Sequence, residues 1–433
     1  METGMTERGN QAVYIVDGSR TPQLKARGVP GLFSAADLAV NAARPLLARQ
    51  PFEPEALDQV ILGCVMAAPE EANIARVVAL RLGCGKRVPA WTVQRNCGSG
   101  MQAIDSALHD IAAGRSGLIL AGGTESMSHA PLLLSTAMVN WLGQFSMARG
   151  LGAKLNIAAR FRPSLLKPVV ALLRGLTDPV VGLSMGQTAE ILAQRFGITR
   201  AMMDAYAVRS HQRLAAAYAT GRLPEVEVLY DDQGNVHAQD DGLRPDSAVE
   251  KLARLKPVFD KEFGLVTAGN SAQVTDGAAW VILASDAVVK KYQLPVLARI
   301  VDSAWAGLDP QQMGLGPVYA MTPVLARQNL NIGEIDYWEI NEAFAAQVLA
   351  CLAAWQDSGY CRDELGLSSG FGAIDEERLN VDGGGISLGH PVGTSGARIV
   401  LHLCHVLQQK NARRGMASLC IGGGQGGAML LER

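Results

Sequence analysis

Hydrophobic and polar positions repeat in the same order in two parts of the chain. PLLARQPFEPEALDQVIL, starting at Pro45, aligns without a gap on PVLARQNLNIGEIDYWEI, starting at Pro323. In each copy a helical pattern ends and an apolar run typical of a strand follows, at residues 60–62 and 337–340. The sequence therefore predicts an internal duplication.

The correspondence continues downstream of each copy. In the first copy, residues 88–94 predict a strand, residues 99–111 a helix and residues 118–121 a second strand. In the second, a helix is predicted from Ser395 and a strand over 417–421, and both copies end in an apolar run, DGAAWVILAS or GGAMLLE. Strand, helix and strand in this order indicate a parallel crossover. The predicted fold class is a duplicated α/β fold.

Residues 126–258 interrupt the first copy and have a different composition. Residues 126–177 contain no Asp or Glu and carry six basic residues among many Leu and Val: Arg149, Lys154, Arg160, Arg162, Lys167 and Arg174. One interpretation is a solvated excursion that covers the sheet. The other is a docking surface for a partner subunit or an anionic membrane face, or a part of the coenzyme site. Helices are predicted over 185–196 and 201–219.

Composition limits the class of protein. The chain has 433 residues, 48% of them hydrophobic, and a formal net charge of 39 − 41 = −2, which disfavours a disordered chain and a nucleic-acid binder. Seven cysteines without a CxxC pair predict neither a disulfide scaffold nor a metal site. The N-terminus contains Glu2 and Glu7, and no apolar run approaches the roughly 18 residues of a bilayer span. We expect a soluble, cytoplasmic protein.

Candidate chemistry lies where predicted strands end, because reactive groups gather at the carboxyl ends of parallel strands. Cys97 follows one strand and precedes the helix start at Ser99, where the helix macrodipole is expected to lower the pKa of its thiol. His390 occupies the same turn in the second copy and is expected to face Cys97 as a base. Taken alone, Cys97 also fits a small core residue and His390 a turn residue.

Two further strand ends carry candidates. Cys420 precedes Gly422-Gly423-Gly424, whose N–H groups could form an oxyanion hole, although a lone buried Cys is more often a core residue. Asn341 follows the run at 337–340 and precedes a helix predicted over 342–354. A helix N-cap is therefore a competing interpretation of Asn341.

Four segments together resemble the signature blocks of the thiolase family: NCGSGMQAI, INEAFAAQ, NVDGGGISLGHPVGTSGARI and CIGGGQGGAMLLE. VDGSRTP and AGNSAQVTDGAA resemble thiolase blocks as well, so the likeness covers essentially the whole chain. It implies the five-layered αβαβα thiolase fold. The implied division is an N-terminal half over 1–125 plus 259–295, a loop domain inserted over 126–258, and a C-terminal half over 296–433.

The resemblance also implies an acyltransferase that cleaves 3-ketoacyl-CoA to acetyl-CoA and a shortened acyl-CoA, or runs the reverse Claisen condensation. Its ping-pong mechanism would pass through an acyl group on Cys97, with His390 as the base and Cys420 as a second acid and base. Asn341 would hold a water that forms one oxyanion hole with His390. The N–H groups of Cys97 and Gly422 would form the other. Coenzyme A would be a substrate, and no permanently bound cofactor is expected.

Substrate contacts are implied at Ser271, Met185, Ala272 and Gly389. Ala272 replaces a serine common in the family, and the block 182–186 lacks a His that many thiolases carry there. The long basic excursion resembles the thiolase subunit of fatty-acid oxidation complexes. It therefore implies β-oxidation, a homodimer or tetramer, and a possible hydratase/dehydrogenase partner.

Other functions stay open on the sequence. A short-chain biosynthetic acetoacetyl-CoA thiolase would share every block. A ketoacyl-synthase-like condensing enzyme would keep Cys97 but have His in place of Cys420, and an inactive scaffold would not need both thiols and His390. A phosphate-binding loop at GGGQGG is disfavoured, because no GKS or GKT and no helix follow it.

Overall fold

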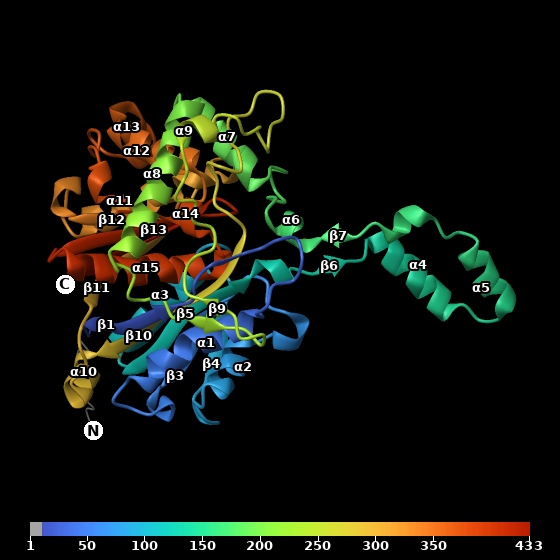
Figure 1. The fold of residues 1–433 in the computed structure, drawn as a ribbon, viewed down its shortest axis with the longest axis horizontal. Helices are drawn as coiled ribbons and strands as arrows, with labels where there is room; N and C mark the ends of the chain where they lie inside the picture. Colours follow the sequence, from blue (N-terminus) through green and yellow to red (C-terminus); the bar gives the residue numbers. More distant parts are fainter. Residues whose placement is uncertain (1–10) are drawn as a thin grey trace, which may run out of the picture.

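A single mixed sheet runs through the computed structural model, which describes residues 11–433 (Figure 1). Its strand order is β12-β13-β14-β11-β1-β10-β5-β3-β4, and β1 and β11 join the two parts in an antiparallel pair. The strands of the first part are β1 (Val13–Arg20), β3 (Gln59–Gly63), β4 (Ala90–Val93), β5 (Leu118–Ser126) and β10 (Thr275–Ser285), with the short β2 (Leu24–Lys25) beside β10. Those of the second are β11 (Ala298–Gly307), β12 (Tyr337–Ile340), β13 (Arg414–Ile421) and β14 (Gln425–Glu432).

The strand order has the symmetry that a duplication predicts. Counted outward from the central pair, β1, β10, β5 and β3 correspond to β11, β14, β13 and β12. β3 pairs in parallel with β5 and β4, β12 pairs in parallel with β13, and β10 and β14 run antiparallel to their neighbours. The two predicted parallel crossovers are confirmed.

Helices form three layers that alternate with the two parts of the sheet. The central pair, α3 (Ser99–Ala112) and α15 (Val392–Gln409), pack against each other and against strands of both parts. Outside the first part lie α1 (Ala35–Ala48) and α2 (Ile74–Arg81). Outside the second lie α11 (Gly316–Arg327) and α12 (Ala345–Gln356). This is the expected five-layered αβαβα fold, and its central layer brings the start of α3 close to the start of α15.

Two helices begin at residues other than those predicted. α15 begins at Val392 and not at Ser395, because Pro391 serves as its N-cap and accepts the N–H groups of Thr394 and Ser395. α12 begins at Ala345 and not at Glu342. The Glu342 carboxylate instead accepts hydrogen bonds from other parts of the chain, among them the side chains of Tyr206, Ser210 and Asn380, and these hold the residue outside the helix.

Between β5 and β10 the chain first forms an arm, residues 132–170, that projects away from the sheet (Figure 1). The arm consists of β6 (Leu132–Leu133), α4 (Thr136–Met147), α5 (Leu151–Ala158) and β7 (Val169–Val170), and α6 (Ala171–Gly175) follows at its base. α4 packs on α5, and β6 pairs with β7. A cover over the sheet, one of the two interpretations from sequence, does not fit this placement.

The rest of this segment packs on the second part of the sheet. The two helices predicted here are present as α7 (Met185–Arg195) and α8 (Arg200–Ala219), and both contact α12. They are followed by β8 (Leu229–Tyr230), β9 (Val236–His237) and α9 (Val249–Leu252). The remaining helices are α10 (Asp286–Tyr292), α13 (Ser358–Leu365) and α14 (Gly385–Leu388). The boundaries of the loop domain stay a prediction. Over residues 11–433, none of the helices is both long enough and apolar enough to cross a membrane.

Candidate active site

Cys97 lies in the turn between β4 and α3. Ser99 fixes this turn, because its hydroxyl accepts the Arg95 N–H and donates to the Asn96 carbonyl, while the Asn96 side chain donates to the Gly422 carbonyl. Burial raises the pKa of the Cys97 thiol to about 11, opposed by a hydrogen bond from the Gly422 N–H. The predicted lowering of this pKa by the helix start is therefore wrong, since burial outweighs it. The thiol carries its proton at neutral pH and needs a base.

His390 lies in the turn before α15, and its hydrogen bonds define which nitrogen is free. Gly389 has a φ of 114°, and a Cβ there would lie 2.3 Å from Thr275, so the turn requires glycine. Nδ1 of His390 lies 2.6 Å from the Ser395 hydroxyl, which donates to the Pro391 carbonyl at 3.2 Å. Because that hydroxyl has one proton, Nδ1 donates to Ser395 and Nε2 keeps its lone pair.

The His390 imidazole is neutral at neutral pH. Burial and, second, the charge of Arg398 lower its pKa to about 4. A neutral imidazole with a free Nε2 can accept a proton from a thiol. The structure therefore gives His390 the protonation state that an activating base needs.

Asn341 lies behind His390 and is fully buried. Its Nδ2 lies 3.5 Å from each ring nitrogen of His390, and its Oδ1 has no partner within residues 11–433, which leaves an acceptor for a water. The N-cap interpretation is wrong, because Phe344 occupies the N-cap of α12.

Cys420 ends close to Cys97. It lies on β13 and is 1% exposed, and burial and, second, the charge of Cys97 raise the pKa of its thiol. A Cβ at Gly422 would lie 3.1 Å from the Met185 sulfur, so a larger residue there would require the Met185 side chain to shift slightly.

One cavity of about 420 Å³ collects most of the predicted residues; we call it the catalytic cavity. Its wall includes Cys97, His390, Cys420, Gly422, Met185, Ser271 and Ala272. Asn341 and Gly389 are outside this wall: the first lies against the His390 ring and the second precedes it in the turn. Both parts of the duplicated fold thus contribute to a single site.

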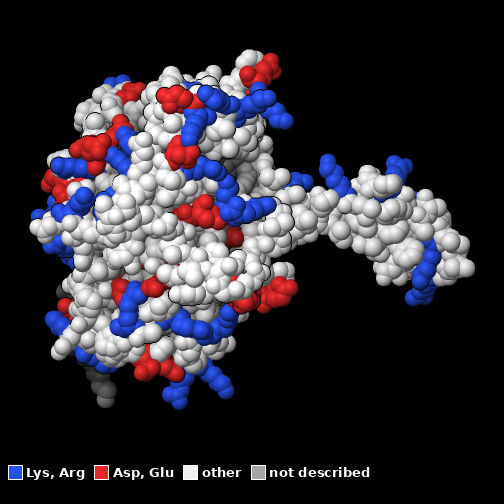
Figure 2. Space-filling view, in the orientation of Figure 1, with Lys and Arg blue, Asp and Glu red and all other residues white. Residues whose placement is uncertain are grey.

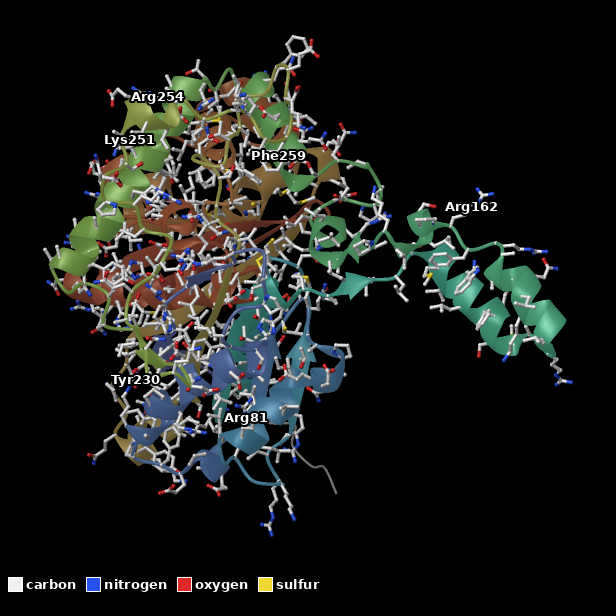
Figure 3. All side chains as sticks on the ribbon, turned by 45° about the vertical axis from the view of Figure 1, so that its right-hand side comes forward. Arg81, Arg162, Tyr230, Lys251, Arg254 and Phe259 are labelled. Carbon is white, nitrogen blue, oxygen red and sulfur yellow. The ribbon has the colours of Figure 1, made fainter. Side chains whose placement is uncertain are left out.

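A second cavity, of about 690 Å³, adjoins the first and is lined by positive charge. This basic cavity has Lys25, Arg244 and Lys251 in its wall and one acidic residue, Asp246. It shares Phe259 and residues 271–274 with the catalytic cavity; Figure 3 labels Lys251 and Phe259. Such a wall could hold the phosphates of a nucleotide. Within residues 11–433, no group of three or more His, Cys, Asp or Glu side chains is arranged so that it could hold a metal ion.

Two residues of the site were missed from the sequence. Ser395 fixes the His390 ring, and Glu125 joins the two parts by accepting the N–H groups of Val65, Met66 and Gly393. Glu125 is fully buried, and burial raises its pKa to about 7. The signal for Glu125 was an acidic residue at the end of the apolar run LILAGGTES. For Ser395 it was a hydroxyl five residues after His390.

Comparison with known proteins agrees with this geometry. The family models "Thiolase, N-terminal domain" and "Thiolase, C-terminal domain" match residues 13–287 and 294–433. A beta-ketoadipyl-CoA thiolase of Pseudomonas aeruginosa is 40% identical, over 98% of this chain and 100% of the relative. A 3-ketoacyl-CoA thiolase of Yersinia pestis is 37% identical, over 99% of this chain and 98% of the relative.

A solved structure is similar as well. Human mitochondrial 3-ketoacyl-CoA thiolase in complex with CoA matches with a TM-score of 0.82 and 37% identity, over 98% of each chain. The two family models together span nearly the whole chain, and the expected fold is present. The chain belongs to the thiolase family.

Proposed function

We propose that the protein cleaves a 3-ketoacyl-CoA with coenzyme A, giving acetyl-CoA and a shortened acyl-CoA, through an acyl group on Cys97. The same site can run the reverse Claisen condensation. One observation carries the proposal: two protonated thiols and a neutral imidazole line the same cavity.

The first half-reaction begins when His390 Nε2 takes the proton of the Cys97 thiol. The sulfur attacks the 3-keto carbon, and the N–H groups of Cys97 and Gly422 stabilise the resulting oxyanion. The bond between C2 and C3 then breaks, and its electron pair forms the enolate of acetyl-CoA. The protonated Nε2 of His390 and a water held by Asn341 donate to the enolate oxygen.

Cys420 completes both half-reactions by moving protons. Its raised pKa keeps it protonated, so it can protonate the enolate carbon and release acetyl-CoA. The resulting thiolate then takes the proton of an incoming CoA thiol. That CoA attacks the thioester carbonyl on Cys97, and the bond between the acyl carbon and the Cys97 sulfur breaks. The shortened acyl-CoA leaves, and the Cys97 sulfur takes back the proton from His390 Nε2.

Coenzyme A is proposed to enter through the basic cavity, and Ser271, Ala272 and Met185 are proposed as substrate contacts. The CoA complex of the human relative supports CoA as a substrate. The proposed mechanism uses no permanently bound cofactor. We further propose a degradative role in fatty-acid β-oxidation, in the cytoplasm and as a homodimer or tetramer. The 3-ketoacyl-CoA thiolase names of relatives support the degradative role. Cys420 argues against a ketoacyl-synthase-like condensing enzyme.

Mass spectrometry after incubation with acetoacetyl-CoA tests the proposal. An acetyl group is expected on Cys97 and absent from the Cys97→Ala variant. An acetyl group that persists at the normal level in this variant would contradict it.

The arm suggests a second role. Its apolar side chains are exposed, with Met147 and Leu151 each at 76%, and Figure 2 shows basic and no acidic side chains on it. Apolar side chains interleaved with positive charge are typical of segments that bind the surface of an anionic membrane. We propose that the arm docks there, and a hydratase/dehydrogenase subunit is the alternative partner.

A further inference from the structure

Resting on the proposed function, we infer that the acyl part of the substrate is an uncharged, apolar chain, and that a substrate with a terminal carboxylate close to the reacting carbon is rejected. The carrying observation is a third cavity of about 550 Å³ beside Cys97, which we call the acyl pocket. Both Cys97 and Gly422 lie in the walls of the catalytic cavity and of the acyl pocket.

The three cavities form a series. The basic cavity shares Phe259 and residues 271–274 with the catalytic cavity, which in turn shares Cys97, Leu176 and Met185 with the acyl pocket. A substrate whose CoA lies in the basic cavity has its 3-keto carbon at Cys97. The carbons beyond that keto group therefore extend into the acyl pocket.

The wall of the acyl pocket is mainly apolar. It includes Val65, Met66, Pro131, Leu172, Leu176 and Val180. Its polar amides are already bonded: Asn96 donates to the Gly422 carbonyl at 2.8 Å, and Gln94 donates to Asn96 at 3.3 Å. An apolar chain can therefore fill the pocket without breaking the hydrogen bonds of these amides.

The one charged side chain in this wall, among residues 11–433, is acidic. Asp178 is 3% exposed, its Oδ1 accepts the N–H groups of Val180 and Val181, and its Oδ2 has no partner among these residues. The basic residue nearest in sequence, Arg174 on α6, is exposed and outside the wall. A carboxylate in this pocket would lose hydration, find no cation and face a like charge.

This chemistry separates two groups of relatives that overall identity does not separate. The name of the 40% identical relative gives it a substrate with a terminal carboxylate, and the 37% identical relatives are named for 3-ketoacyl-CoA in general. The chemistry of the acyl pocket favours a substrate of the kind for which the second group is named, without a terminal carboxylate.

The test compares two substrates of equal length, 3-ketohexanoyl-CoA and 3-ketoadipyl-CoA, which differ only in a terminal methyl or carboxylate group. We expect kcat/KM to favour 3-ketohexanoyl-CoA by about 100-fold or more, since burying an unpaired charge costs several kcal/mol. Lengthening the tail from acetoacetyl-CoA should raise kcat/KM by up to about fourfold per buried methylene. Equal values, or a preference for 3-ketoadipyl-CoA, would overturn the inference.

The same assay separates failure of this inference from failure of the proposed function. If acetoacetyl-CoA is cleaved and neither six-carbon substrate is, the acyl pocket does not hold the tail and the inference alone fails. If no substrate is cleaved and Cys97 is never acylated, both fail.

Variants of the wall provide an internal control. Leu172→Arg should raise the ratio of 3-ketoadipyl-CoA to 3-ketohexanoyl-CoA cleavage at least tenfold, and the neutral Leu172→Gln should not reach that gain. A ratio is independent of the fraction of folded enzyme. Arg174→Ala should leave the ratio unchanged. A wild-type enzyme that cleaves 3-ketoadipyl-CoA well and loses this activity in Arg174→Ala would contradict the inference.

Discussion

At the scale of single residues, the chemistry depends on which groups hold protons. The Cys97 thiol has a pKa raised to about 11, and the His390 imidazole has one lowered to about 4. We therefore expect the thiolate to form by proton transfer to His390 as an electrophile reacts, and not to be stored in the free protein. Because the pKa of His390 is about 4, its imidazole is already neutral at pH 5.5 and can accept a proton.

This arrangement predicts how Cys97 reacts with iodoacetamide. In the wild type the rate should be nearly constant from pH 5.5 to 8.5, because His390 stays neutral across that range. In His390→Ala the rate should fall by 10²–10⁴ near neutral pH, the loss typical of a missing general base. It should also rise about tenfold per pH unit, because only the rare thiolate reacts.

Peptide mass spectrometry separates alkylation of Cys97 from that of Cys420. Ser395→Ala is the matched control, since it keeps the base and removes the contact that orients it. A His390→Ala variant with the wild-type rate and pH profile would remove His390 from the mechanism.

The candidate residues could be predicted from sequence, but their electrostatics could not. Motif and strand-end position were enough to select Cys97, His390 and Cys420, which the fold brings to one cavity. The pKa of Cys97 depends on burial by residues far away in sequence, so the local helix-start argument failed. Glu125 was missed because its partner Gly393 is far away in sequence. Ser395 is close to His390 in sequence, but the contact between them depends on how the turn before α15 folds.

At the scale of elements, α15 joins the site to a buried charge cluster. His402, in the middle of this helix, lies 3.0 Å from Glu225 and 3.4 Å from Asp382. Burial lowers the pKa of His402, but the charge of Glu225 and the hydrogen bonds to Asp382 and Glu225 outweigh it and raise the pKa to about 10. His402 is therefore protonated at neutral pH and ties α15 to the segment before β8.

The stability that His402 supplies should depend on pH. Because its folded pKa lies above the unfolded value of about 6.5, this stability is fully present below pH 6.5 and is lost as pH rises towards 10. His402→Gln should cost up to about 3–5 kcal/mol at pH 6, since it removes the cation between two buried carboxylates and, among residues 11–433, leaves Glu225 only Arg20 and Asp382 only Arg222 as ion-pair partners.

Thermal unfolding of wild type and variant at several pH values measures this. The gap between their Tm values should narrow from pH 6.5 to 10, and His109→Gln, at an exposed histidine of α3, should show little gap at any pH. A gap that stays constant over this range would mean that His402 is not protonated in the folded protein.

Elements were predicted better than their ends. The repeat and the periodicity located β3, β12, β13 and α3, because apolar spacing is a local property. The start of α12 was misplaced by three residues, because Glu342 binds groups from α8 and from the segment before α15.

At the scale of the whole molecule, the arm is the part whose placement sequence could not predict. Its composition indicated either a cover or a docking surface, and only the structure shows it extending from the body (Figures 1 and 3). The side chains of Trp141, Phe145 and Phe161 pack together within it, which gives the arm a small aromatic cluster of its own.

Charge reversal tests the docking role of the arm. Changing Arg160, Arg162 and Lys167 to Glu should abolish sedimentation with phosphatidylserine-containing vesicles, since each charge near such a surface contributes about 1 kcal/mol. Cleavage of acetoacetyl-CoA should change little. The matched control reverses three exposed basic residues of the body, Lys86, Arg87 and Lys290. A wild-type protein that binds no vesicles but captures a hydratase/dehydrogenase subunit would assign the arm to that partner.

The central claim is that both parts of the duplicated fold act on one acyl-enzyme, and isolating that intermediate tests it most directly. Cys420→Ser is incubated with acetoacetyl-CoA, freed of small molecules, analysed by peptide mass spectrometry and then mixed with fresh CoA. We predict an acetyl group on Cys97 that CoA removes as acetyl-CoA, more slowly than in the wild type by 10²–10⁴. An unmodified Cys97, or an acetyl group that CoA does not remove, would contradict the account.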